Sequence, residues 1–96
     1  MKVVLTDLAE EDLAAIHQNY TRRPGTTAEQ VLGTILRAIN GLALFPLMGR
    51  PGAVPETRER IVTRYSFRIV YHVDETKQIV EVWRVMPSAH PRPPAE

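Results

Sequence analysis

The chain of 96 residues has no cysteine and no apolar run near the roughly 20 residues that a membrane-spanning helix needs. The first absence excludes a disulfide framework and a thiolate metal site. The second excludes a helical membrane span, and we expect no membrane partner. The first five residues lead at once into acidic ones, so the apolar core of a signal peptide is also missing. These absences favour a single small cytoplasmic domain.

Signatures of cofactor and metal chemistry are absent as well. Residues 49–52, Gly-Arg-Pro-Gly, do not match a phosphate-binding glycine loop. The three histidines, His17, His72 and His90, lack the spacing of metal ligands, and no carboxylate pair joins them in a recognisable motif. We therefore expect no metal and no cofactor.

What the sequence does have is a local concentration of arginine. Residues 50–73 hold five arginines and two glutamates, a net charge of +3, whereas residues 1–49 and 74–96 each carry −1. Guanidinium groups bind phosphate or carboxylate through a planar fork. The pattern predicts several cations on one side of a small sheet, although a merely solvated strand face has the same composition. The candidate contacts for a target or partner are Arg50, Arg58, Arg60, Arg64, Arg68, His72 and Arg84.

The first half of the chain predicts a strand at residues 2–6 and two helices. Asp7 with Glu10, and Thr26 with Glu29, have the spacing of capping boxes that begin helices. Each helix has an apolar stripe, and Pro24-Gly25 separates the two, so they should form an antiparallel hairpin. Gly33 either permits a close approach of the second helix to its neighbours, which we expect, or is a tolerated weak position in that helix. The stripes are Ala9, Leu13, Ile16 and Tyr20, then Ala28, Val31, Ile35, Ile39 and Leu42.

The second half predicts three strands, at residues 58–65, 67–73 and 78–86. Residues 45–57 are expected to be irregular because they contain three prolines and two glycines. Phe67 and Trp83 are expected in the core. The result is an α+β fold of order β-α-α-β-β-β, with a helical hairpin on one face of a mainly antiparallel sheet. Residues 1–90 should form the domain, and the proline-rich residues 91–96 a mobile, extended tail.

Three segments together resemble the signature of the RelE/ParE superfamily of toxins. They are Arg50-Pro51-Gly52, Thr57-Arg58-Glu59, and residues 65–71, Tyr-Ser-Phe-Arg-Ile-Val-Tyr. The resemblance covers most of the chain. It implies a type II toxin that inhibits growth and that a cognate antitoxin, ParD-like or related, neutralises in a hetero-oligomeric complex.

The resemblance also implies one of two activities. RelE-like toxins cleave mRNA on the ribosome, and ParE-like toxins poison DNA gyrase without being nucleases. A nuclease here would use Arg68 and Arg64 at the phosphate and His90 for proton transfer. However, the strand before Arg68 has no lysine, no tyrosine follows residue 71, and Pro87 and His90 depart from the family's closing pattern. The ParE-like branch is favoured, with the nuclease and a degenerate, binding-only toxin as alternatives.

Overall fold

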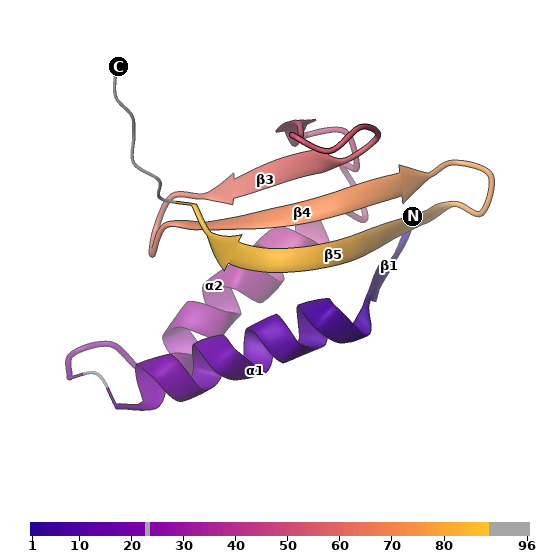
Figure 1. Cartoon of the computed structure of the whole chain (residues 1–96). Coiled ribbons are helices and arrows are strands. Elements are labelled where there is room, and N and C mark those ends of the chain that lie inside the picture. The colour runs from indigo at the N-terminus through magenta and orange to yellow at the C-terminus, as the bar shows by residue number, and fades with distance from the viewer. Residues whose placement is uncertain (23, 89–96) are drawn as a thin grey trace, which may run out of the picture.

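The computed structural model describes residues 1–22 and 24–88, which form two helices and a five-stranded sheet (Figure 1). The spatial order of the strands is β1-β5-β4-β3-β2, with β1 parallel to β5 and the other neighbours antiparallel. The predicted α+β class and element order are confirmed. The end of the predicted domain at residue 90, and the tail at residues 91–96, lie outside the described residues. The elements are β1 Lys2–Leu5, α1 Asp7–Thr21, α2 Ala28–Gly41, β2 Arg50–Pro51, β3 Arg58–Val62, β4 Phe67–Asp74 and β5 Ile79–Pro87.

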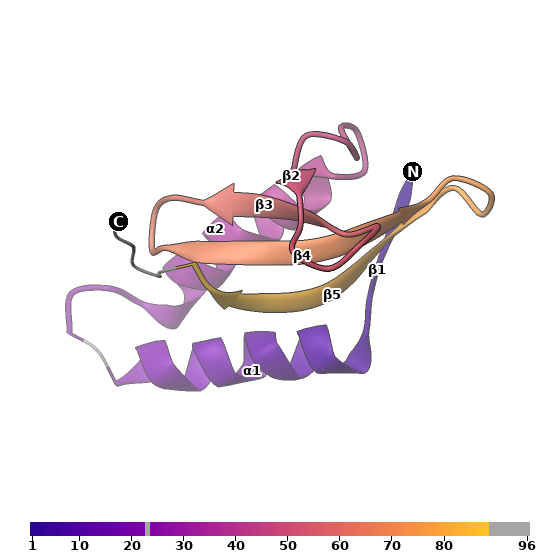
Figure 2. The ribbon, with the colours of Figure 1, turned by 45° about the horizontal axis from the view of Figure 1, so that its top comes forward.

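Both helices lie on one side of the sheet, with α2 behind the central strands and α1 along β5 (Figures 1 and 2). The apolar stripe of each helix faces inward as its spacing predicts. Burying these side chains against the sheet supplies most of the driving force for folding, at about 25 cal/mol per Å² of apolar surface. The core contains Ala9, Ile16, Val31, Ile35, Ile39, Leu42, Val62, Phe67, Ile69, Tyr71, Val80, Val82 and Val85.

The helix caps fall one residue away from the predicted ones. Thr6, not Asp7, caps α1, since its hydroxyl accepts from the amide of Ala9 at 3.1 Å. Thr27 caps α2 and forms a reciprocal capping box with Gln30, with both hydrogen bonds at 3.1 Å. Two adjacent residues can each cap a helix. Only the backbone geometry decides which side-chain oxygen reaches the amide three residues further along the chain.

Of the two interpretations of Gly33, the close approach is wrong and the tolerated weak position holds. A methyl group placed on its Cα would find only the guanidinium of Arg37 within 4 Å, at an ordinary contact distance of 3.5 Å. No helix or strand in the described part of the chain packs closely against this position, so Gly33 is a tolerated weak point of α2.

The strands differ from the prediction at their ends and at one bulge. β3 stops at Val62, and the segment predicted to be wholly irregular contributes the two-residue strand β2. In the β4–β5 ladder Val70 pairs with Arg84 but Tyr71 pairs with Val82, which leaves Trp83 as the extra residue of a bulge. The prediction that Trp83 belongs to the core is therefore wrong. Phe67 is buried as expected.

Trp83 instead lies partly exposed beside Glu81 of its own strand and His72 of β4. Its indole nitrogen donates to Glu81 at 2.7 Å, and its ring lies 6.0 Å from the ring of His72. The bulge turns an apolar residue of β5 away from the core and adds aromatic surface beside β4.

Candidate partner-binding face

The register of the strands divides the arginines between the two faces of the sheet. Side chains of directly paired residues in an antiparallel ladder point to the same face. Arg58 pairs with Tyr71 and Arg60 with Ile69, and both partners are fully buried on the helix-covered face. Arg68 alternates with these partners along β4, so its side chain points to the opposite face. The prediction of a single arginine face is wrong, because it depended on a register that the sequence does not specify.

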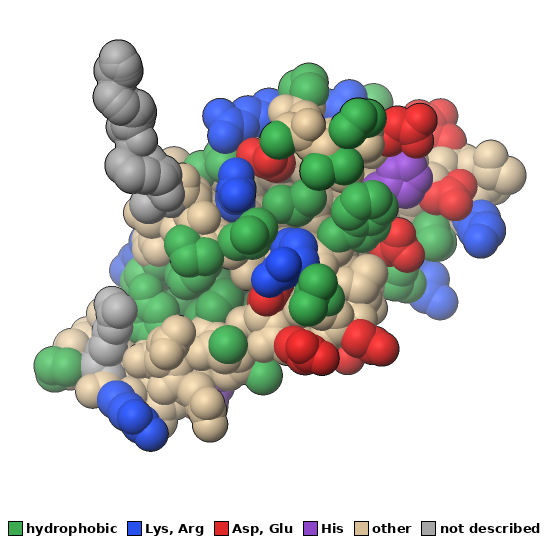
Figure 3. Space-filling model, in the orientation of Figure 1, with side chains coloured by type: hydrophobic (Ala, Val, Ile, Leu, Met, Phe, Trp, Pro, Cys, Tyr) green, Lys and Arg blue, Asp and Glu red, His purple; other side chains and the backbone are tan. Residues whose placement is uncertain are grey.

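The face that α1 and α2 leave uncovered mixes apolar and charged side chains, and we call it the open face. Figure 3 shows apolar groups gathered over the strands with Lys or Arg side chains among them. A surface of this kind suits an amphipathic segment of another protein that carries acidic residues. The open face comprises Arg50, Glu59, Ile61, Arg68, Val70, His72, Arg84 and Met86.

A buried carboxylate lies among the cations of the open face. The side chain of Glu59 is 8% exposed, and its Oε1 lies 3.4 Å from Arg50 Nη2 and 3.7 Å from Arg68 Nη1. Arg68 also contacts the sulfur of Met86 at 3.8 Å, whereas its Nε is buried without a hydrogen-bond partner among the described residues. Glu59 therefore neutralises part of the positive charge that the sequence places here, and it fixes the direction of the Arg68 side chain.

Arg84 is held within the chain by the first helix. Its Nε and Nη2 donate to the two carboxylate oxygens of Asp12 at 2.8 and 3.0 Å. The amide of Val85 donates to the same carboxylate at 2.9 Å. Because β1 ends at Leu5, Asp12 takes the place of a strand partner for this part of β5.

Asp12 is therefore a structural carboxylate. Its burial opposes ionisation, but the hydrogen bonds from Arg84 and Val85 and the charge of Arg84 outweigh burial. The pKa of Asp12 is held below its ordinary value of 3.8.

The segment between α2 and β3 is fixed by Tyr71 and Arg58. The hydroxyl of Tyr71 donates to the carbonyl of Pro46 at 2.7 Å and accepts from the amide of Gly49 at 2.9 Å. Arg58 donates to the carbonyls of Leu47 and Gly49 at 3.3 and 2.7 Å. A methyl group on Gly49 would lie 2.6 Å from the Tyr71 hydroxyl, so glycine is required at this position. Tyr71 and Arg58, which belong to the signature segments, therefore have a structural role here.

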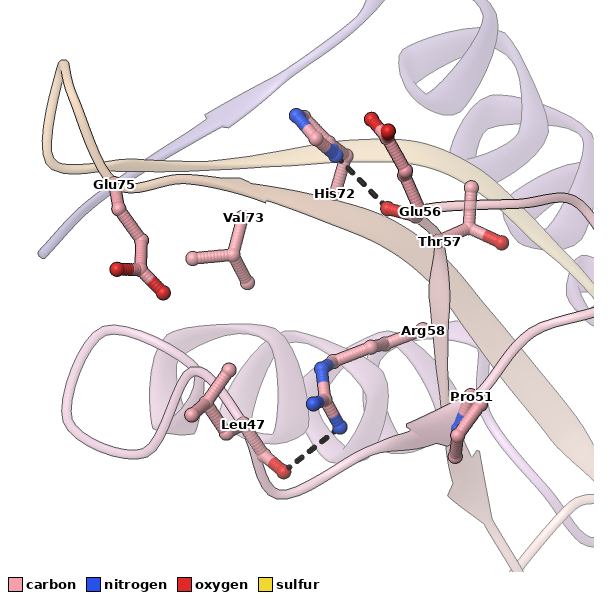
Figure 4. A pocket seen from close by; sticks show the side chains of 8 residues that line it. All are labelled: Leu47, Pro51, Glu56, Thr57, Arg58, His72, Val73 and Glu75. Atoms are coloured by element: carbon pink, nitrogen blue, oxygen red, sulfur yellow. Dashed lines mark hydrogen bonds between the residues drawn. The ribbon is translucent and has the colours of Figure 1, made fainter.

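A hollow of about 510 Å³ opens beside this segment (Figure 4). It lies at the C-terminal end of β4, where the β4–β5 turn begins. His72 contributes to it, and its Nδ1 lies 2.9 Å from the carbonyl oxygen of Glu56. Glu56 adopts a positive φ of 67°, which presents this carbonyl to the histidine. The hollow's lining comprises Leu47, Pro51, Glu56, Thr57, Arg58, His72, Val73 and Glu75.

Two of the three residues predicted for a nuclease site, Arg68 and Arg64, are described by the structure and lie in different surroundings. Arg68 lies on the open face against Glu59. Arg64 lies in the β3–β4 turn, with its guanidinium over the ring of Tyr65 at 5.4 Å. His90 lies outside the described residues. Arg60 contributes to a hollow beside α2 with Arg64 and has no part in the open face.

An exposed apolar cluster in the connecting segment escaped the sequence interpretation. Its side chains are about half exposed or more, from 48% at Met48 to 77% at Leu44. The run of apolar residues that continues past the end of α2 between residues 42 and 48 is the signal that could have found it. The cluster comprises Leu44, Phe45, Leu47 and Met48, and Val54 in the same connecting segment is also exposed.

Residues 1–22 and 24–88 contain no group of three or more side chains that could hold a metal ion. Neither α1 nor α2 is long and apolar enough to cross a membrane.

A family model described as the ParE toxin of the type II toxin–antitoxin system parDE matches residues 3–91. No curated protein sequence matches the chain.

Solved structures are similar over nearly the whole chain. The chromosomal ParDE system from P. aeruginosa has a TM-score of 0.81 at 24% identity, over 93% of this chain and 97% of that chain. The RelBE2 toxin–antitoxin complex of Mycobacterium tuberculosis has a TM-score of 0.66 at 22% identity, covering 90% and 95%. The intact E. coli RelBE complex has a TM-score of 0.56 at 15% identity, covering 93% and 98%. At these sequence identities, the similarity to solved structures shows that the chain shares their fold.

Proposed function

The chain belongs to the ParE toxin family of type II toxin–antitoxin systems, and from this premise we propose that it is a growth-inhibiting toxin that acts on DNA gyrase. A cognate antitoxin, ParD-like or related, holds it inactive in a hetero-oligomeric complex. The activity is stoichiometric inhibition by binding and involves no enzymatic step. Gyrase as target places the protein in the cytoplasm.

The position of Glu59 is the observation that carries the gyrase proposal over mRNA cleavage. A RelE-like nuclease would present Arg68 to a phosphate. Here Arg68 lies 3.7 Å from the carboxylate of Glu59, and the residue directly opposite it on β3 is Ile61. A phosphate at Arg68 would meet the negative charge of Glu59 at close range, and this repulsion disfavours phosphate binding there.

The open face supports antitoxin binding. The ParDE and RelBE structures that resemble the chain come from toxin–antitoxin systems. The open face offers apolar side chains at Ile61, Val70 and Met86 beside the exposed guanidinium of Arg50. An antitoxin segment with acidic and apolar residues would cover the apolar groups and pair with Arg50.

Supercoiling assays with purified gyrase and relaxed plasmid test the target. We expect the toxin at stoichiometric excess to abolish supercoiling or to trap gyrase–DNA cleavage complexes. Prior addition of the cognate antitoxin should restore activity. In a translating extract the same toxin should leave a reporter mRNA at full length.

Two outcomes overturn the gyrase proposal. Ribosome-dependent cutting of the mRNA that disappears in Arg68→Ala would establish the nuclease instead. Full activity of both gyrase and translation, together with normal growth on induction, would establish a degenerate toxin.

A further inference from the structure

Three arginines line one hollow between α2 and β3. The hollow has a volume of about 330 Å³. Arg37 reaches it from α2, Arg60 from β3 and Arg64 from the β3–β4 turn. The hydroxyl-bearing Thr34 and Thr63 also line it, and none of its described lining residues is acidic.

None of these three arginines has a carboxylate within ion-pair distance among residues 1–22 and 24–88. Arg37 donates to the hydroxyl of Thr34 at 3.3 Å. Arg60 donates to the carbonyl of Ile61, and its Nε is buried without a hydrogen-bond partner.

Three other arginines of the sheet have a carboxylate partner, whereas Arg58, like Arg60, donates to backbone carbonyls. Arg50 and Arg68 face Glu59, Arg84 is bound by Asp12, and Arg58 by two carbonyls. Three like charges around one hollow repel each other, so an anion in the hollow would stabilise the arrangement.

The backbone of the β3–β4 turn holds one of the three cations in place. Tyr65 and Ser66 have positive φ angles of 77° and 58°. For an aromatic residue such as Tyr65 this conformation is uncommon and costs free energy. The Tyr65 ring packs against the core, 6.3 Å from the ring of Tyr20, and the guanidinium of Arg64 lies over it. The strained turn thus fixes Arg64 at the rim of the hollow.

The donor set suits a phosphate group. A guanidinium presents two parallel N–H donors, and three of them with the hydroxyl of Thr63 match an oxyanion with several acceptor oxygens. The hydroxyl of Thr34 is not counted as a donor because it donates to the carbonyl of Gln30 at 3.0 Å. An acidic protein segment would also require exposed apolar surface for the centre of its interface. The exposed large apolar side chains gather instead in the connecting segment after α2, and only Leu36, 40% exposed, lies in the same part of α2.

We infer that the hollow between Arg37, Arg60 and Arg64 binds a backbone phosphate of a nucleic acid. The site goes beyond the proposed function, since inhibition of gyrase through protein contacts does not need it. Duplex DNA and single-stranded RNA both carry this chemical group, and the experiment distinguishes them.

Fluorescence anisotropy with a short labelled DNA duplex and a labelled RNA strand tests the site on the full chain without antitoxin. The variant Arg37→Ala/Arg64→Ala removes two exposed guanidinium groups and leaves the core intact. We expect it to weaken binding of at least one nucleic acid by about tenfold at low salt. For duplex DNA, the plot of the logarithm of the association constant against the logarithm of the salt concentration has a negative slope. Its magnitude should decrease by about 0.9 for each phosphate contact removed.

The matched control is Lys2→Ala/Lys77→Ala, which removes the same charge from exposed positions on β1 and the β4–β5 turn. This control should leave the affinity for both nucleic acids within about twofold of that of the parent chain. Equal weakening by both double variants, or no binding by the parent chain, overturns the site. The site is also overturned if inorganic phosphate or poly-glutamate binds at these arginines and neither nucleic acid binds there.

Discussion

At the residue scale, the phenol of Tyr71 joins two distant parts of the chain. It bonds both to the carbonyl of Pro46 and to the buried amide of Gly49. Tyr71 is itself fully buried, and burial raises its pKa, although the Gly49 hydrogen bond and the charges of Arg58 and Arg60 oppose the rise. The hydroxyl therefore stays protonated and can donate and accept at once.

Replacing Tyr71 by phenylalanine should destabilise the fold by about 1–3 kcal/mol, because the Gly49 amide loses its acceptor inside the protein. Urea unfolding followed by circular dichroism measures this. Tyr65→Phe makes the same change at a hydroxyl that has no hydrogen bond to residues 1–22 and 24–88, and it should stay within about 0.5 kcal/mol of the parent. Equal losses in the two variants would count against the role given to the Tyr71 hydroxyl.

The carboxylate of Asp12 makes stability depend on pH. Its pKa is lower in the folded chain than the ordinary 3.8, so its contribution is present above that value. The contribution disappears as pH falls through the folded pKa. Asp12→Asn removes the charge and keeps a similar shape, so it should lower the free energy of unfolding at neutral pH.

The difference in the free energy of unfolding between the parent chain and Asp12→Asn should shrink as the solution is acidified below pH 3.8. Urea titrations from neutral to strongly acidic pH measure it, with Glu75→Gln, at an exposed turn, as the control. A gap that stays constant or widens in acid would contradict the assignment.

At the scale of the element, periodicity predicted the helices and their buried faces. Ala9 and Ile16, and then Val31, Ile35 and Ile39, recur at helical spacing and are all buried. The caps could not be placed by pattern, because the tetrapeptides that begin at Thr26 and at Thr27 both have a capping-box composition. Hydrogen-bond geometry, which a pattern does not contain, selects Thr27.

Thr27→Ala should therefore cost about 1 kcal/mol, whereas Thr26→Ala should be nearly neutral. The loss arises because the amide of Gln30 no longer has the hydroxyl acceptor. Thermal and urea unfolding of both variants separate the two positions. A larger loss at Thr26 would show that α2 begins one residue earlier.

At the scale of the whole molecule, the sheet separates two groups of arginines that the sequence presents as one. The family signature and the alternation along β4 were visible in the sequence. The faces of Arg58, Arg60 and Arg68 depend on which residue of β3 lies opposite which residue of β4. The four-residue turn from Thr63 to Ser66 sets this register through two positive φ angles at non-glycine residues, and no local pattern predicts that turn.

The separation makes the two proposed surfaces independent of each other. Arg50→Ala/Val70→Asp changes the open face, removing one cation and placing a charge where apolar cover is expected. It should weaken antitoxin binding by about tenfold or more and leave nucleic-acid binding within about twofold. Arg37→Ala/Arg64→Ala should do the reverse. Isothermal titration calorimetry with the antitoxin and anisotropy with nucleic acid measure the two affinities on the same preparations.

The quadruple variant tests independence directly. Because Arg37 lies on α2 and Arg64 in the β3–β4 turn, neither belongs to the open face, and the effects of the two double variants on each affinity should add within about 0.5 kcal/mol. Coupling well above that value would mean that one ligand contacts both faces, which would join the antitoxin and nucleic-acid surfaces into one site. Additivity with each affinity lost separately would establish a toxin with one face for its antitoxin and another for nucleic-acid phosphate.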